Sequence, residues 1–367
     1  MSSDDRRYMA LALGLARRGL GQTWPNPAVG CVIVEQQGDA GRVVGRGWTQ
    51  PGGRPHAETS ALAQAGTRAR GATVYVTLEP CAHHAKTPPC AAALISAGVG
   101  RVVSAVTDSD PRVSGQGHSM LRAAGIAVTT PLMDDAAREL NRGFFLRLTG
   151  ARPMLTLKLA SSFDGRIATA GGESQWITGP EARRNVHMMR ARHDAVMVGA
   201  GTVRADDPIL TVRGLGIERQ PVRIVVSRAL DLPLQSRLAA SAKELPLWLC
   251  HGRGADPGLI AAWQGLGAKT LACDIAGLGL DMAAVLGALA AEGLTRVFCE
   301  GGGALAASLL SAGLVDELVG FTAGLVIGAE GQPALGHIGL DNLGEAPRFR
   351  LVEQRRVGPD ILHRWVR

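Results

Sequence analysis

Short apolar runs alternate with segments of helical hydrophobic periodicity along most of the chain. The first part opens with a predicted helix over residues 4–19. Its predicted strands cover residues 28–35, 42–48, 72–80 and 101–107. Proline and glycine mark helix ends between these strands, as at Pro55 and Gly66. The alternation of strands and helices indicates a sheet covered by helices.

The pattern breaks in "NRGFFLRLTGARP" (141–153), where a helical stretch ends and the strand "MLTLKLASS" begins. We therefore divide the chain into domains of residues 1–146 and 147–367, each long enough to bury its own core. The second part alternates in the same way, with helices predicted over 180–191 and 281–292 between apolar strands. Both parts are expected to be α/β domains.

Composition narrows the class of protein. No apolar run reaches the roughly 18 residues of a membrane helix. The apolar first helix runs into Arg17 and Arg18 without a small-residue cleavage site, so it is read as a helix and not as a signal peptide. The cysteines are scattered and form no disulfide framework, which indicates a reducing, cytoplasmic setting. They lie at positions 31, 81, 90, 250, 273 and 299.

The formal charge of +7 raises the question of nucleic-acid binding. The arginines are spread along the chain, and aromatic residues make up only 4%, which leaves little for stacking on bases. A coding bias toward Arg, Ala and Gly explains the charge without such a partner. Only four of the 39 basic residues are lysines. Two of these, Lys86 and Lys158, lie in the motifs described below, where an ammonium group would have a purpose.

A metal site is indicated in the first part. His56-Ala-Glu58 lies at the start of a predicted helix, Cys81 follows a strand, and Cys90 lies at the amino end of a helix. One imidazole and two thiolates would leave the fourth position of Zn²⁺ open for water, as in catalytic zinc sites. Zinc deaminases combine an H-x-E tripeptide with P-C-x-x-C and use the Glu as proton shuttle. Here the corresponding pieces are H-A-E and P-C-x8-C, so the loop between the two cysteines is longer. Taken alone, an H-x-E tripeptide is common on exposed helices, and the two cysteines could be core residues.

The second part of the chain gives weaker indications of a functional site. Lys158 lies in the middle of a predicted strand, where a lysine normally needs a partner. The stretch "RVFCEGGGALAASLL" reads as a strand, a glycine turn and a helix, whose free N–H groups suit a pyrophosphate. It lacks the G-x-G-x-x-G pattern, and by itself such a turn is more often structural than a cofactor loop.

The motifs "PNPAVGCVIV", "PHAE", "LEPCAHHAKTPPC" and "TDSDPRVSGQG" together resemble the deaminase half of the bifunctional riboflavin-biosynthesis deaminase–reductases, over essentially all of residues 5–150. Residues 152–367 resemble the reductase half of the same family. The resemblance implies a cytidine-deaminase-like domain followed by a dihydrofolate-reductase-like domain. It implies deamination of 2,5-diamino-6-(5-phosphoribosylamino)pyrimidin-4(3H)-one. It also implies reduction of the ribosyl chain of 5-amino-6-(5-phosphoribosylamino)uracil to ribityl by NADPH.

The resemblance assigns roles residue by residue. In the deaminase, His56, Cys81 and Cys90 match the Zn²⁺ ligands and Glu58 the catalytic residue, whereas the substrate contacts match Asn26, His83, Lys86 and Asp110. The NADPH contacts match Ala160, Trp176, Thr202, Asp206, Gly302, Gly303 and Ala304. The substrate contacts of the reductase match Ser174, Arg190, Leu210, Arg213 and Glu300, with the two arginines as phosphate clamps. Lys158 is the further catalytic candidate. A partner for the cofactor's 2′-phosphate is sought near Ser227 and Arg228.

Two positions depart from these assignments. Arg112 stands where the family often has asparagine, so one substrate contact is absent or replaced, and His84 has no matched role. The expected partners are small phosphorylated pyrimidines, without nucleic acid or membrane, and the chain is expected to form a homo-oligomer. Two alternatives stay open, a nucleic-acid-editing zinc deaminase with an accessory domain and a non-catalytic protein that binds zinc and nucleotide.

Overall fold

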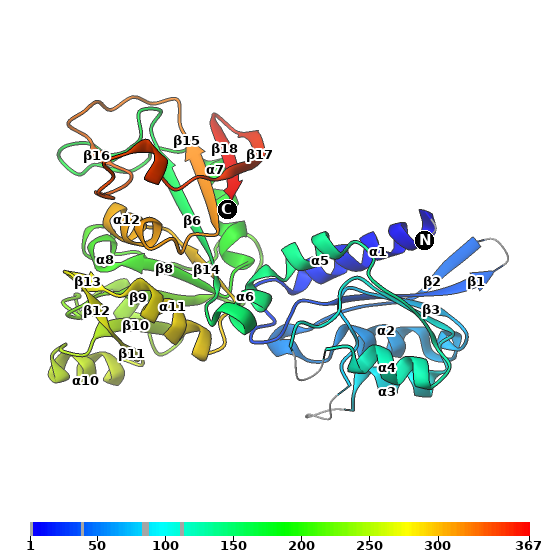
Figure 1. Cartoon of the computed structure of the whole chain (residues 1–367). Helices are drawn as coiled ribbons and strands as arrows, with labels where there is room; N and C mark the ends of the chain where they lie inside the picture. The colour runs from blue at the N-terminus through cyan, green and yellow to red at the C-terminus, as the bar shows by residue number, and fades with distance from the viewer. Residues whose placement is uncertain (1–2, 38–39, 83–87, 111–113) are drawn as a thin grey trace. The chain divides into compact units, whose positions relative to one another are not determined.

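The structure, a computed structural model of the chain, describes residues 3–37, 40–82, 88–110 and 114–367. It divides into two units, Met1–Gly150 and Ala151–Arg367 (Figure 1). The boundary expected between residues 146 and 147 lies inside helix α6 (Arg142–Gly150). Phe145 of this helix is buried in the core of the first unit, and the first unit extends to the end of the helix.

The first unit is built on a five-stranded sheet in the order β2-β1-β3-β4-β5. β1 is antiparallel to β2 and to β3, whereas β3, β4 and β5 are parallel. The strands are β1 (Gly30–Gln37), β2 (Ala40–Trp48), β3 (Thr73–Val76), β4 (Arg101–Ser104) and β5 (Ala127–Thr129). The other helices are α1 (Ser3–Ala16), α2 (Ala57–Ala65), α3 (Cys90–Ala97), α4 (Gln116–Ala123) and α5 (Asp134–Leu140).

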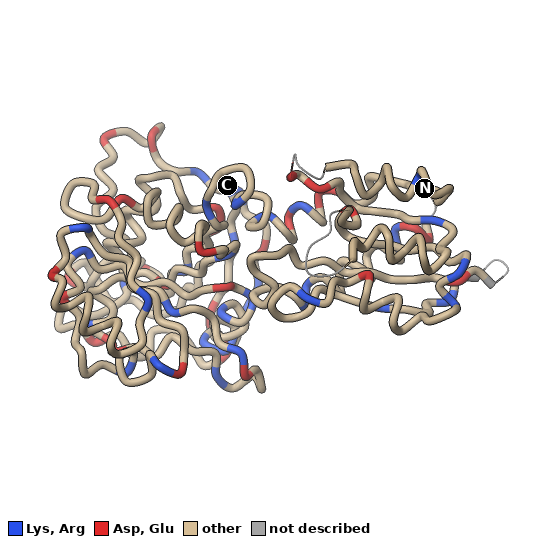
Figure 2. Tube along the Cα trace, turned by 90° about the horizontal axis from the view of Figure 1, so that it is seen from below, with Lys and Arg blue, Asp and Glu red and all other residues tan. Residues whose placement is uncertain are grey.

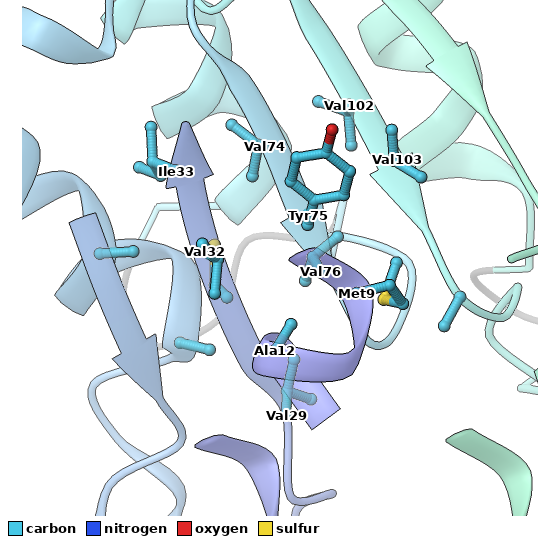
Figure 3. Close-up of a cluster of buried hydrophobic side chains, with 14 of the residues drawn as sticks. Met9, Ala12, Val29, Val32, Ile33, Val74, Tyr75, Val76, Val102 and Val103 are labelled. Atoms are coloured by element: carbon cyan, nitrogen blue, oxygen red, sulfur yellow. The ribbon is translucent and has the colours of Figure 1, made fainter. Parts of the chain in front are cut away.

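Helices cover both faces of this sheet. Figure 1 shows α1 and α5 on one face and α2, α3 and α4 on the other. Strand β1 is accordingly apolar on both faces, and the run from Cys31 to Val34 is buried throughout. Figure 3 shows Met9 and Ala12 of α1 beside Val29 and Val76. A fully buried Val or Met side chain contributes about 1.5–3 kcal/mol to folding, so this core stabilises the sheet that carries the candidate metal site.

Two sequence-based details of the first unit differ from the structure. The strand expected over 72–80 ends at Val76, and the chain then leaves the sheet toward Pro80, which has no N–H for a strand ladder. The helix expected to open at Pro55 begins at Ala57, with His56 in the N-cap position. The first difference lengthens the loop that leads to Cys81, and the second places His56 at the end of a helix rather than inside it.

The second unit holds a nine-stranded sheet in the order β11-β10-β9-β8-β14-β6-β15-β18-β17. The strands are parallel from β11 to β15, and the hairpin of β17 and β18 runs antiparallel at one edge. The strands are β6 (Met154–Ser161), β8 (Ala195–Gly199), β9 (Val222–Val226), β10 (Leu247–Gly252), β11 (Lys269–Cys273), β14 (Arg296–Cys299), β15 (Glu317–Thr322), β17 (Arg350–Val357) and β18 (Asp360–Val366).

The helices of the second unit connect these strands. They are α7 (Pro180–Ala191), α8 (Ala200–Asp206), α9 (Arg237–Ala240), α10 (Pro257–Gly265), α11 (Met282–Ala291) and α12 (Gly303–Ser311). Two small ribbons pair β7 (Arg166–Ala168) with β16 (Gln332–Pro333) and β12 (Ile275–Ala276) with β13 (Gly279–Leu280). The helix expected over 180–191 is confirmed with the same bounds. Among the described residues, no helix has the length and apolar character that crossing a membrane requires.

Candidate active sites

Three side chains converge in the first unit. His56 precedes α2, Cys81 lies in the loop after β3, and Cys90 is the first residue of α3. The His56 Nδ1 atom lies 3.2 Å from the Cys90 Sγ atom and 3.7 Å from the Cys81 Sγ atom. All three ligand atoms lie within 4.8 Å of one another. The set of one imidazole and two thiols fits Zn²⁺ with one open coordination position.

Hydrogen bonds within this cluster shift the pKa values of all three side chains. A hydrogen bond from the Cys90 thiol, together with contacts to His56, lowers the pKa of Cys81 to about 4. The same bond raises the pKa of Cys90, and a hydrogen bond with Cys81 raises the pKa of His56. Zinc requires deprotonated ligands, so its binding here would release protons and weaken at acid pH.

Glu58 lies in the first turn of α2, two positions after His56, and is only 4% exposed. Burial raises the pKa of its carboxyl group to about 7. A group that titrates near neutral pH can both accept and return a proton during a reaction. The side chain therefore has the chemistry required of a proton shuttle beside the metal ligands.

The predicted substrate contacts of the first unit are only partly described. Asn26 packs against Gly53, which has a φ of +87°, and a Cβ atom on that glycine would lie 1.9 Å from the Asn26 Nδ2 atom. Asp110 is half-buried, and its N–H donates to the Asp108 carboxylate at 2.9 Å. The other assigned positions, His83 and Lys86, lie outside the described residues, as do His84 and Arg112.

Glu79 was not singled out by the sequence analysis. Its buried carboxylate accepts hydrogen bonds from the backbone N–H groups of Asp108, Gly115 and His118, at 3.1, 2.9 and 3.2 Å. The available signal was an acidic residue directly before Pro-Cys, at the end of an apolar strand. Sequence pattern alone does not say which backbone donors such a carboxylate would meet.

In the second unit, a cleft of about 680 Å³ opens at the carboxyl ends of β6, β8 and β14. Ligands of parallel α/β sheets bind at this end of the strands. The cleft collects most of the residues assigned to the cofactor and part of those assigned to the substrate. These lining residues are Lys158, Ala160, Ser174, Thr202, Asp206, Glu300, Gly302, Gly303 and Ala304. Arg228 also lines it.

The glycine turn forms one wall of this cleft. Helix α12 begins at Gly303 with Gly302 as its N-cap, and the Gly302 N–H donates to the Thr202 hydroxyl at 3.0 Å. This bond joins the turn to helix α8. The first N–H groups of α12 are free of intrahelical partners and carry the positive end of the helix dipole. The wall therefore suits the phosphates of a dinucleotide.

Lys158 and Glu300 lie on the cleft walls with opposite charges. Burial lowers the pKa of Lys158, an effect that Arg190 reinforces and Glu300 opposes. Burial alone would raise the pKa of Glu300, but the charge of Arg190 and its hydrogen bonds outweigh this, so the pKa is lowered. An ionised carboxylate thus faces a lysine whose proton is held less tightly than usual.

Four assigned residues do not line the cleft. Trp176 is 67% exposed, with the Arg183 guanidinium 4.3 Å from its ring centre. The Arg190 Nε and Nη2 atoms donate hydrogen bonds to the Glu300 carboxylate at 2.5 and 3.0 Å. The Arg190 Nη1 atom donates to the Thr211 carbonyl at 2.8 Å. Arg190 therefore holds Glu300 in place in this structure, and three of its donors are already engaged. The other two residues are Leu210 and Arg213.

His187 is a second residue that the sequence analysis missed. Its Nδ1 atom accepts the backbone N–H of Arg213 at 3.3 Å. It lies one turn before Arg190 on α7, a spacing that puts both side chains on the same face of the helix. That spacing was visible in the sequence, but the contact with Arg213 depends on a loop whose path the sequence does not show.

Comparison with known proteins links both sites to characterised families. Residues 2–106 match the cytidine and deoxycytidylate deaminase zinc-binding region, and residues 153–363 match the RibD C-terminal domain. Riboflavin biosynthesis protein RibD of Escherichia coli is 42% identical over 97% of this chain and 98% of its own length. The solved structure of Acinetobacter baumannii RibD, form 1, has a TM-score of 0.87 at 38% identity, covering 99% of this chain and 98% of that one.

A further similar structure is that of a protein named after two chemical activities. It is a diaminohydroxyphosphoribosylaminopyrimidine deaminase/5-amino-6-(5-phosphoribosylamino)uracil reductase from Thermotoga maritima. Its TM-score is 0.85 at 32% identity, covering 99% of this chain and 98% of that one. Together these matches confirm the predicted fold class, a cytidine-deaminase-like domain followed by a reductase domain.

Proposed function

Because the chain belongs to the RibD family of bifunctional riboflavin-biosynthesis deaminase–reductases, we propose that its two units divide the two reactions between them. The first unit deaminates 2,5-diamino-6-(5-phosphoribosylamino)pyrimidin-4(3H)-one. The second reduces the ribosyl chain of 5-amino-6-(5-phosphoribosylamino)uracil to ribityl with NADPH. Membership in this family disfavours both alternatives, the nucleic-acid-editing deaminase and the non-catalytic binding protein.

The observation that carries the deaminase assignment is the convergence of His56, Cys81 and Cys90 beside the buried Glu58. Zinc bound by these three residues supplies a water that ionises near neutral pH. Glu58 takes a proton from the attacking water and delivers it to the departing amino group. Asn26 and Asp110 orient the pyrimidine, and His83 and Lys86 hold the phosphate.

The cleft of the second unit supports the reductase assignment. NADPH supplies the hydride when bound. The amino end of α12 and the Thr202 hydroxyl face the region where its phosphates would lie. Ser174, Arg213 and Glu300 orient the substrate, and Arg190 keeps Glu300 ionised. Lys158 provides the proton that accompanies the hydride.

One experiment tests the division of labour. Zinc content, ammonia release and NADPH oxidation are measured for the wild type and for Cys81→Ser. A serine hydroxyl is a poor zinc ligand, so zinc content and ammonia release should fall to roughly a tenth or less. NADPH oxidation on the deaminated substrate should stay at the wild-type rate, because the second unit has its own core and cleft.

Cys273→Ser is the matched control, since it exchanges a buried cysteine of the second unit that is neither a proposed zinc ligand nor a lining residue of the cleft. It should keep its zinc and both activities. Full ammonia release by zinc-free Cys81→Ser would contradict the proposed metal site.

We further propose that the enzyme works as a homo-oligomer in the cytoplasm, without nucleic acid. A hollow of about 330 Å³ on the sheet of β6, β15 and β18 includes Leu159, Leu318, Phe349 and Trp365 in its lining, a surface suited to another copy of the chain. Figure 2 shows Lys and Arg interleaved with Asp and Glu over the described residues of both units, and these residues form no basic stripe of the kind that binds a nucleic acid. All six cysteines are free thiols, as a reducing compartment requires.

The proposed oligomer has a direct test. Light scattering after size exclusion should give a mass of at least two chains for the wild type. Trp365→Glu, which places a charge in the hollow, should lower that mass. A wild type that runs as a single chain at micromolar concentration would contradict the proposal.

A further inference from the structure

We propose that Glu79 is a positioning residue for the deaminase substrate, because its carboxylate anchors the turn that presents Asp110. The inference rests on the proposed function, in which Asp110 contacts the pyrimidine. Glu79 lies two positions before the metal ligand Cys81. It would therefore fix the substrate-binding turn relative to the loop that carries a metal ligand.

The carboxylate of Glu79 is 5% exposed and meets only backbone donors at hydrogen-bond distance among the contacts described. Its Oε2 atom accepts the N–H groups of Asp108 and Gly115, at 3.1 and 2.9 Å. Its Oε1 atom accepts the N–H of His118 at 3.2 Å. Hydrogen bonds to an ionised acceptor are roughly twice as strong as neutral ones. These three bonds therefore hold the two ends of a segment, with Asp108 at one end and Gly115 and His118 at the other.

Asp110 is fixed inside that segment. Its N–H donates to the Asp108 carboxylate at 2.9 Å, and its carbonyl accepts the N–H of Ser114 at 2.8 Å. Asp108 is itself held by Glu79. A short series of contacts thus runs from Glu79 through Asp108 to the backbone of Asp110.

The chain around this segment also contacts the loop that carries the metal ligand Cys81. The Glu79 N–H donates to the Val106 carbonyl at 2.9 Å. At Gly117, a Cβ atom would lie 1.9 Å from the Pro80 carbonyl oxygen, so the two backbones approach as closely as a glycine allows. The Cys81 carbonyl then accepts the N–H of Ala91 in α3 at 3.1 Å. Movement of the Asp110 turn relative to Cys81 would break several of these contacts.

A different role for Glu79 can be set aside. Ser104, His118 and Glu79 stand in the order of a hydrolase triad, with the Ser104 Oγ atom 2.8 Å from the His118 Nε2 atom. However, the His118 Nδ1 atom is 3.9 Å from the Glu79 Oε2 atom, beyond hydrogen-bond distance. Ser104 is fully buried and could not reach a substrate. The arrangement is therefore a structural network beneath the deaminase site.

The test uses the full-length, zinc-loaded enzyme with steady-state ammonia release. Glu79→Gln keeps the size of the side chain but turns an NH₂ group toward backbone donors. The KM for the pyrimidine should rise roughly tenfold with little change in kcat, because the turn is misplaced while the chemistry is intact. Asp108→Ala breaks the next contact in the series and should raise KM in the same way. Zinc content reports whether the first unit of each variant has folded around its metal site, and NADPH oxidation on the deaminated substrate shows that the second unit is unaffected.

A double variant tests whether Glu79 acts through Asp110. Asp110→Asn alone should raise KM, and adding Glu79→Gln should raise it by much less than the product of the two single effects. The control is Glu35→Gln, which removes a partly exposed pair with Arg68 in the same unit and should leave KM unchanged.

The outcomes separate the inference from the function on which it rests. If Asp110→Asn leaves KM unchanged, the substrate contact proposed for Asp110 is wrong. If Asp110→Asn raises KM while Glu79→Gln does not, the positioning role of Glu79 is wrong. Loss of zinc from Glu79→Gln would also overturn the inference. So would a KM of the double variant that rises by the full product of the two single effects.

Discussion

Replacing Glu58 by glutamine should slow ammonia release by roughly 10³-fold while zinc stays bound. Deamination moves one proton off the attacking water and another onto the leaving amino group. Glu58 is buried beside the metal ligands, and burial raises its pKa to about 7, which suits both transfers. The amide of Glu58→Gln fills the same space but cannot take up a proton. The measurement is single-turnover ammonia release together with the zinc content of the purified protein.

The second activity of the same chain supplies the control for Glu58→Gln. Its NADPH oxidation on the deaminated substrate should equal that of the wild type, because the cleft belongs to the other unit. Glu35→Gln serves again as a carboxylate exchange away from the site, with both activities kept. Ammonia release within tenfold of the wild-type rate would mean that another group carries the proton.

Replacing Lys158 by methionine should slow NADPH oxidation by roughly 10²-fold to 10⁴-fold and leave deamination unchanged. Reduction of the ribosyl chain adds a hydride to carbon and requires a proton as well. Lys158 lines the cleft, and burial lowers its pKa, which makes it a better proton donor than an exposed lysine. Methionine has a similar length and removes only the ammonium group. The expected loss is therefore in kcat, measured with saturating NADPH.

Lys269→Met is the matched control for this substitution. Lys269 lies on the edge strand β11, pairs with Glu292 and is partly exposed, so its loss should affect neither activity. Binding of NADPH to Lys158→Met should stay close to that of the wild type. A variant that changes only the affinity for NADPH, with kcat intact, would show that Lys158 binds the cofactor and does not donate the proton.

The sequence predicted that His56, Cys81 and Cys90 come together, because each of them lies at the end of a helix or strand. His56 precedes a helix, Cys90 begins one, and Cys81 follows a strand, and these boundaries follow from proline, glycine and apolar periodicity. β2 and β3 run in the same direction, because both are antiparallel to β1, so their carboxyl ends lie at the same edge of the sheet. What could not be predicted is the protonation of the cluster, because it depends on distances of a few ångströms between side chains far apart in sequence.

Contacts between residues far apart in the sequence set the limit of what could be predicted in the second unit. The sequence predicts that Arg190 binds a phosphate. This prediction uses only the positive charge of Arg190 and takes no account of the side chains that surround it. In the structure Arg190 is hydrogen-bonded to Glu300, 110 positions away in the sequence, and no local sequence pattern predicts that pair. Helix α10 shows the opposite case: Asp256 caps it and Pro257 opens it, a clear local signal that the sequence analysis did not use.

The division of the chain into two units with separate cores has a consequence for genetics. With the proposed division of the two reactions, a missense mutation in one unit should remove one step of the pathway without unfolding the other unit, and so yield one of two distinct classes of auxotroph. Alleles from the two classes can complement each other within one cell, because each product still supplies the step that the other lacks. A single gene would thus behave in a cross as two.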